Sequence, residues 1–316
     1  MEGWTSLGVP STIARALLEE NLLIPTAIQA MTLPPAILGR KDILGAAETG
    51  SGKTLAFGIP ILNGILELKK NEEMVVRTSS GIFKEKIENS PTSESDVNDS
   101  GVEKFPNSQN HSQKVKQSGN GFAQVSDDNH DNIIVNKLKP LYALILTPTR
   151  ELAVQIRSHL AKAARYTNVK MAVVVGGMAA VKQERILRKC PEIVIGTPGR
   201  LWELISDGNL HLSQINSIRY LVIDETDRML EKGHFEELHN IMAKINSKDH
   251  RIPHRQTFVF SATLTIVHDI PKHLKRKKAH YSKSKILKLT PGQKLQQVID
   301  TLRLENPKVI DLTRKT

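Results

Sequence analysis

Six short runs of aliphatic and β-branched residues constrain the fold of this chain more than any other feature. They lie at Asp42–Ala46, Leu141–Thr147, Met171–Val175, Glu192–Gly196, Tyr220–Asp224 and Thr257–Ser261. Between them, apolar residues recur at helical spacing, for example in Glu151–Ala164 and Leu201–Ser206. Apolar strands that alternate with helices indicate a parallel sheet covered on both faces. The sequence therefore predicts an α/β domain that binds ligands at the carboxyl ends of its strands.

Two regions depart from this pattern and divide the chain. Residues 69–140 are rich in Ser, Asn, Asp, Lys and Gln and poor in large apolar residues, so we expect a mostly disordered insertion. Residues 272–316 begin with the basic cluster KHLKRKK, which fits a solvated linker, a nucleic-acid contact or an import signal. The folded domain is then expected to comprise residues 1–68 and 141–271.

The composition limits the classes of partner that this chain is expected to bind. The chain has 44 Lys and Arg against 33 Asp and Glu, a net charge of +11, which favours a polyanion such as nucleic acid. A basic protein of no special function also fits that charge. The single cysteine, Cys190, excludes an internal disulfide or a multi-cysteine zinc site. The longest apolar stretch, Met171–Val181, is shorter than the ~20 residues of a membrane span, so no membrane partner is expected.

Residues 47–54, with the sequence AETGSGKT, follow the first predicted strand and precede a helical segment, Leu55–Leu66. Gly50 and Gly52 allow the backbone N–H groups to wrap a phosphate at the start of that helix. Lys53 would reach the β- and γ-phosphates, and the Thr54 hydroxyl would bind Mg²⁺. Ala47 stands where the strict pattern has glycine, and a glycine-rich turn without a ligand is the alternative interpretation.

A second predicted half of the site follows the strand Tyr220–Ile223. Asp224 and Glu225 come directly after this strand, at the sheet edge where ligands bind. Asp224 would hold Mg²⁺, and Glu225 would orient and deprotonate an attacking water. An acidic pair after a strand often only starts a polar loop. Combined with the Lys53 loop, it predicts a nucleotide hydrolysis site.

These residues resemble the motifs of the DEAD-box RNA helicase family. Residues 224–227 read DETD, with Thr226 at the usual alanine. The other first-lobe motifs follow in the family order: PTAIQ at 25–29 with Trp4 upstream, PTRELA at 148–153, Gly176-Gly177, TPGR at 197–200 and Ser261-Ala262-Thr263. At positions 21 and 22 this chain has Asn-Leu, where the family commonly has Gly-Phe. The resemblance covers nearly the whole chain except the insertion, and implies the RecA-like P-loop NTPase fold.

The resemblance also implies a role for each motif residue. ATP contacts are expected from Trp4, Thr26, Gln29, Glu48, Thr49, Gly50, Ser51, Gly52, Lys53 and Thr54. The Gln29 amide can pair with N6 and N7 of adenine, which favours ATP over GTP. Single-stranded RNA backbone contacts are expected from Pro148, Thr149, Arg150, Gly176, Gly177, Thr197, Pro198, Gly199 and Arg200. Asp227, Ser261 and Thr263 are expected to couple the two sites.

The likeness is strongest to a nucleolar subgroup linked to assembly of the large ribosomal subunit, which implies nuclear and nucleolar location, ribosomal precursor RNA, and protein partners for the insertion. The family's second lobe has no counterpart in these 316 residues, so weak nucleotide binding and little hydrolysis or unwinding are expected of the chain alone. Two other classes stay open. One is a P-loop ATPase acting on DNA or protein, and the other is a non-catalytic module that recruits RNA or partners.

Overall fold

The computed structural model describes residues 2–88, 139–231, 235–247, 255–262, 299–300, 302, 304 and 307–313. The chain divides into two compact units, one formed by Met1–Glu73 with Leu138–Thr316 and the other by Met74–Lys137. In the second unit only a helical backbone segment that ends at Glu88 is described. All of the predicted site residues belong to the first unit.

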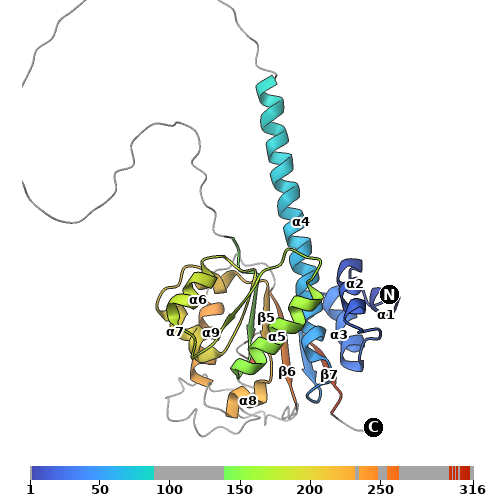
Figure 1. The fold of residues 1–316 in the computed structure, drawn as a ribbon, viewed down its shortest axis with the longest axis vertical. Coiled ribbons are helices and arrows are strands. Elements are labelled where there is room, and N and C mark those ends of the chain that lie inside the picture. The colour runs from blue at the N-terminus through green and yellow to red at the C-terminus, as the bar shows by residue number, and fades with distance from the viewer. Residues whose placement is uncertain are drawn as a thin grey trace, which may run out of the picture. The chain divides into compact units, whose positions relative to one another are not determined.

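Among the described residues, seven parallel strands form one sheet in the order β3-β4-β2-β5-β6-β1-β7. Figure 1 labels β5, β6 and β7 of this sheet. The bounds of the strands are β1 Ile43–Ala46, β2 Ala143–Leu146, β3 Met171–Val174, β4 Ile193–Gly196, β5 Tyr220–Ile223, β6 Gln256–Ser261 and β7 Lys308–Asp311. All six predicted apolar runs are strands of this sheet, so the predicted parallel α/β fold is confirmed. Because every strand runs the same way, the loops that follow them meet at one edge.

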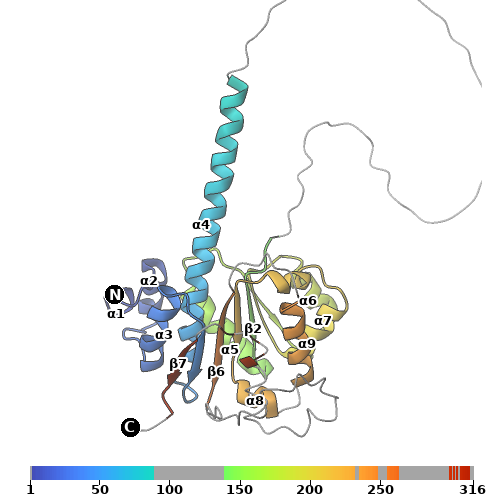
Figure 2. The same cartoon turned by 180° about the vertical axis from the view of Figure 1, so that it is seen from behind.

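Helices cover both faces of the sheet (Figure 2). Their bounds are α1 Glu2–Thr5, α2 Ser11–Glu19, α3 Ala27–Ile37, α4 Lys53–Glu88, α5 Arg150–Ala163, α6 Ala180–Leu187, α7 Pro198–Ser206, η1 Leu212–Ser217, α8 Thr226–Glu231 and α9 Phe235–Ile245. Alternate strand residues enter two separate cores, as Leu144 and Ile145 of β2 do. One core receives buried side chains from α1 to α5, and the other from α6 to α9 and η1. Among the described helices, none combines the length and apolar character needed to cross a lipid bilayer.

The predicted start of the insertion, at residue 69, is too early. Helix α4 continues without a break through this position to Glu88. Lys69 Nζ lies 2.6 Å from Glu192 Oε1, and the Tyr142 hydroxyl donates to Glu72 Oε1 at 2.6 Å. The composition did not predict that the helix continues here, because polar and charged contacts, not apolar packing, attach this segment to the first unit. Residues 89–138 lie outside the described residues.

The predicted linker at 272–316 also needs correction at its end. Lys308–Asp311 forms the edge strand β7, which pairs in parallel with β1 from Lys308↔Ile43 to Asp311↔Ala46. Ile310 is buried in the core, whereas Val309 is half exposed. An edge strand of four residues with one buried side chain gives little apolar signal in the sequence. The basic cluster at 272–278 lies outside the described residues.

Candidate nucleotide and nucleic-acid site

The predicted phosphate loop connects β1 to the start of α4 and folds against the segment at 26–29. Gly50 and Gly52 have φ of 84° and 97°, in the left-handed region that favours glycine. A methyl group at Gly52 would lie 2.5 Å from Gln29 Nε2 and 2.8 Å from Thr26 Oγ1. The loop therefore needs glycine at 52 both for its backbone conformation and for this close approach.

Lys53 lies inside the loop that it is predicted to serve. Its side chain is buried, and Nζ donates to the carbonyl oxygens of Ala47 at 2.6 Å and Glu48 at 3.2 Å. These two carbonyls replace some of the hydration that a buried ammonium loses. An anion bound in the loop would offer Lys53 a stronger, charge-assisted partner than either carbonyl.

The acidic pair follows β5, and both side chains are buried. Asp224 Oδ1 accepts from the Glu225 backbone N–H at 3.0 Å, and Glu225 Oε2 pairs with Arg228 Nη1 at 3.1 Å. Glu225 has φ of 49°, a strained value for this residue type. Burial raises the pKa of Asp224 to about 7; Lys53 opposes this rise, and the charges of Glu225 and Asp227 add to it. Such clustered carboxylates favour a cation, and oxygen ligands suit Mg²⁺.

These groups line a single cavity of about 500 Å³. A cavity of this size is within the range of small-molecule sites. Of the residues predicted to bind ATP or metal, the structure brings ten to its wall: Trp4, Thr26, Gln29, Thr49, Gly50, Gly52, Lys53, Thr54, Asp224 and Glu225. Glu48 and Ser51 belong to the same loop but are not part of the wall. The glycine cradle, the buried ammonium and the clustered acids fit a magnesium-bound nucleoside triphosphate.

The segment at 21–29 forms the far side of the cavity. Gln29 Oε1 accepts from the Thr26 N–H at 2.8 Å, and Gln29 Nε2 donates to Gly52 O at 3.1 Å. Each amide atom can make one further hydrogen bond, so base recognition by Gln29 stays possible. Trp4 is buried and donates its indole N–H to Leu22 O at 2.8 Å, which anchors the loop that contributes Leu22 to the wall. Asn21 has φ of 59°, a conformation suited to the glycine more common there.

Helix α5 forms a wall of the cavity that the sequence analysis missed. It contributes Leu152, Gln155, His159, Lys162 and Ala163. These residues recur three and four apart, so they lie on one helical face. The sequence offered that spacing as a signal, but three of the five residues are polar, so the face resembles an ordinary solvated surface.

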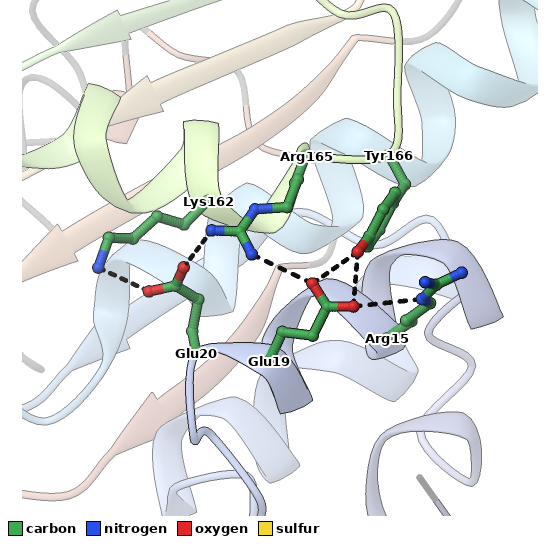
Figure 3. Close-up of polar contacts among 6 residues, drawn as sticks. All are labelled: Arg15, Glu19, Glu20, Lys162, Arg165 and Tyr166. Carbon is green, nitrogen blue, oxygen red and sulfur yellow. Dashed lines mark hydrogen bonds and ion pairs between the residues drawn. The ribbon is translucent and has the colours of Figure 1, made fainter.

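A network of side chains joins this end of α5 to α2, as Figure 3 shows. It comprises Arg15, Glu19, Glu20, Lys162, Arg165 and Tyr166. Glu20 pairs with Lys162 Nζ and Arg165 Nη2, both at 2.7 Å. Glu19 accepts from the Tyr166 hydroxyl at 2.5 Å and pairs with Arg165 Nη1 at 3.1 Å. The hydrogen bond from Lys162 is the main cause that lowers the pKa of Glu20. Because Glu20 and Lys162 also line the cavity, this network fixes one of its rims.

We expect His159→Ala and Gln155→Ala each to weaken ATP binding to the lobe by roughly 3–10-fold. A lost hydrogen bond of 0.5–1.5 kcal/mol corresponds to this range. Fluorescent-nucleotide titration would measure the change. Arg157→Ala is the matched control, because Arg157 is exposed on the same helix but is absent from the cavity wall. Equal affinities for all three variants and the unaltered chain would show that ATP does not contact this wall.

Three loops with predicted RNA-binding residues follow the adjacent strands β2, β4 and β3. Thr149 caps α5 by accepting from the Leu152 N–H at 3.3 Å, and Arg150 begins the helix. Gly177 has φ of 78°, and a methyl group there would overlap the Arg150 guanidinium. The residues at 148–150 and the glycine pair at 176–177 therefore form one contiguous surface.

The third loop leads into α7. Thr197 is its N-cap, Pro198 occupies the first turn, and Gly199 has open space around its Cα. Arg200 Nη1 pairs with Glu203 Oε1 at 2.5 Å. Within the described part of the chain, Nε and Nη2 of Arg200 are buried and have no hydrogen-bond partner. Guanidinium donors at a helix start are suited to a phosphate, and the buried donors of Arg200 reach one only after this side chain moves.

Of the predicted coupling residues, Asp227 lies in α8, which follows β5, and Ser261 is the last residue of the neighbouring strand β6. Thr226 joins these segments, because its hydroxyl lies 3.1 Å from Phe260 O and 3.3 Å from Ile223 O. Ser261 is buried beside this contact, and Asp227 Oδ1 has no hydrogen-bond partner among the described residues. Thr263 lies outside the described residues. The hydroxyl of Thr226 is available here because the usual alanine is replaced.

The fold and the cavity define a P-loop nucleotide-binding lobe of the RecA-like type. A family model described as DEAD/DEAH box helicase matches residues 26–270. The chain belongs to this family.

Curated relatives and solved structures agree with this assignment. The chain is 38% identical to ATP-dependent RNA helicase DDX24 of Mus musculus, over 99% of this chain and 42% of that protein. A hypothetical ATP-dependent RNA helicase from Sulfolobus tokodaii has 25% identity and a TM-score of 0.54, over 95% of this chain and 56% of its own. DEAD-box helicase Mss116 bound to ssRNA and UDP-BeF shares the fold, with 20% identity and a TM-score of 0.60, over 97% of this chain and 44% of its own. The chain thus spans about two fifths of the curated relative.

Proposed function

We propose that this chain is the ATP- and RNA-binding first lobe of an ATP-dependent RNA helicase. The observation that carries the proposal is the convergence of Lys53, Asp224 and Glu225 on one cavity. Loops that bear Arg150, Gly177 and Arg200 follow strands of the same parallel sheet, so they share its carboxyl edge. A nucleotide and a nucleic-acid backbone can therefore occupy neighbouring parts of that edge.

In the proposed reaction, the loop amides and Lys53 bind the phosphates, and Thr54 with Asp224 would hold Mg²⁺. When bound, the metal offsets charge on the phosphate oxygens. Glu225 orients a water for attack on the γ-phosphorus and takes its proton, and the bond to the β-phosphate oxygen breaks. Gln29 selects adenine through its amide, which offers both a donor and an acceptor.

The proposed RNA contacts are backbone contacts. Arg150 and Arg200 supply guanidinium groups, and the turn at 176–177 supplies backbone N–H groups. Contacts of this kind position a strand but carry no base information, so binding is expected to be independent of sequence and strongly dependent on salt. The finer assignments to ribosomal precursor RNA and the nucleolus follow the subgroup resemblance, as does the expectation of partners for the insertion.

A competition experiment on the 316-residue chain tests the proposal. We expect ATP to displace a fluorescent adenine nucleotide at lower concentration than GTP, and single-stranded RNA to bind more tightly than DNA of the same sequence. Equal affinity for ATP and GTP, together with tighter binding of DNA than of RNA, would favour a P-loop ATPase that acts on DNA or protein. RNA binding without any detectable nucleotide binding would favour a recruitment module.

A further inference from the structure

The turn at Gly176-Gly177 is held from inside the molecule by one side chain, Gln183. This residue lies on α6 and is fully buried. Its Nε2 donates to Val175 O at 3.0 Å and to Met178 O at 3.1 Å. Val175 and Met178 flank the glycine pair, so a single amide group fixes both ends of the turn.

The side-chain amide of Gln183 donates both of its hydrogens to this turn. A side-chain amide nitrogen has two hydrogens, and the two carbonyls account for both. Within the described residues, the Gln183 Oε1 atom is buried and has no hydrogen-bond partner. A buried acceptor without a partner disfavours folding, so the two donors carry what Gln183 contributes at this position.

The Gly176-Gly177 turn supports the Arg150 side chain. Gly177 adopts a φ of 78°, and the Arg150 guanidinium lies so close that a methyl group at Gly177 would overlap it. A displacement of the turn would therefore move the surface on which Arg150 rests. The contacts run from Gln183 to the turn and from the turn to Arg150.

We infer that Gln183 is a positioning residue of the RNA-backbone site. It holds the 175–178 backbone in the conformation that presents the N–H groups of the turn and the Arg150 guanidinium to one phosphate segment. The inference rests on the proposed function, because it gives this turn a nucleic-acid ligand. No Gln183 atom needs to touch the RNA.

Gln183→Met and Gln183→Glu test this inference in the 316-residue chain. Methionine keeps the length of the side chain but makes no such hydrogen bonds, and glutamate lacks the two amide hydrogens. With a single-stranded RNA oligonucleotide, we expect both variants to bind roughly 3–10-fold more weakly, as for the loss of one or two hydrogen bonds. ATP affinity, measured by nucleotide titration, should stay unchanged. Arg150→Ala should reduce the slope of log affinity against log salt by about one, whereas Gln183→Met, which displaces the guanidinium but keeps its charge, should reduce it by less.

Gln214→Met is the matched control. Gln214 also makes side-chain hydrogen bonds to backbone carbonyls, at Lys139 and His211, but it lies on η1 and away from the predicted RNA loops. Its loss should lower thermal stability without affecting RNA affinity. Unchanged RNA affinity in both Gln183 variants, or equal losses for RNA and ATP, would overturn the inference alone, provided that Arg150→Ala weakens RNA binding. An unaltered chain that binds ATP but no RNA would overturn the RNA part of the proposed function together with it.

Discussion

Replacing Lys53 with alanine is expected to lower the ATP affinity of the lobe by roughly 10–100-fold, as for the loss of a charged hydrogen bond of 1.5–3 kcal/mol. Lys53 is the only ammonium among the described residues of the phosphate loop, and its Nζ already lies within the loop, 2.6 Å from Ala47 O. The substitution removes the positive charge that stabilises the Asp224 carboxylate and opposes the rise of its pKa. Isothermal titration with Mg-ATP would measure the change.

Lys189→Ala provides the control for charge, because Lys189 is exposed and is not part of the cavity wall. This variant should bind ATP like the unaltered chain. RNA affinity in the absence of nucleotide should be similar in all three proteins, since the predicted RNA contacts come from other loops. An ATP affinity within a factor of two of the unaltered chain after Lys53→Ala would contradict the proposed phosphate site.

The sequence predicted strands β1 to β6 because five of them are buried on both faces, and the edge strand β3 is still apolar along its length. Such strands are apolar along their whole length, as the buried residues 143–146 of β2 illustrate. The phosphate loop could also be predicted from the sequence, because its glycines and Lys53 lie within one short segment. Residue type and spacing were enough to predict this loop, whereas the contacts of Lys53 with the carbonyls of Ala47 and Glu48 came from the structure alone.

Several features that depend on distant partners were not predicted. Lys69 contacts Glu192 and the carbonyl oxygen of Asn168, both far away in the sequence, and β7 pairs with the edge that β1 offers. Nothing in the sequence distinguishes Gln183 from other polar residues, because its hydrogen bonds are to two carbonyls that the fold brings beside it. The cavity wall that α5 forms was not predicted for the same reason. Each of these contacts depends on the arrangement of segments in space.

Phe260→Ala is expected to destabilise the lobe by about 3–5 kcal/mol, the usual cost of emptying a buried aromatic site. Phe260 is fully buried in β6, and its ring centroid lies 5.7 Å from that of Phe57 on α4. The ring also covers Gly45 of β1, where a methyl group would overlap it. Because β1 and α4 flank the phosphate loop, the cavity left by the ring would loosen both supports of Lys53.

Chemical denaturation would measure this loss of stability, and the expected change is a large fraction of the roughly 5–15 kcal/mol that stabilises a typical domain. Val154→Ala is the matched control, because Val154 is 56% exposed and its truncation should change stability by less than about 0.5 kcal/mol. Below the unfolding transition, Phe260→Ala should also bind ATP more weakly, since Gly45 and Phe57 lose their common neighbour. A loss of stability below about 1 kcal/mol would mean that β1 and α4 close around the empty site, and that the phosphate loop is held by other contacts.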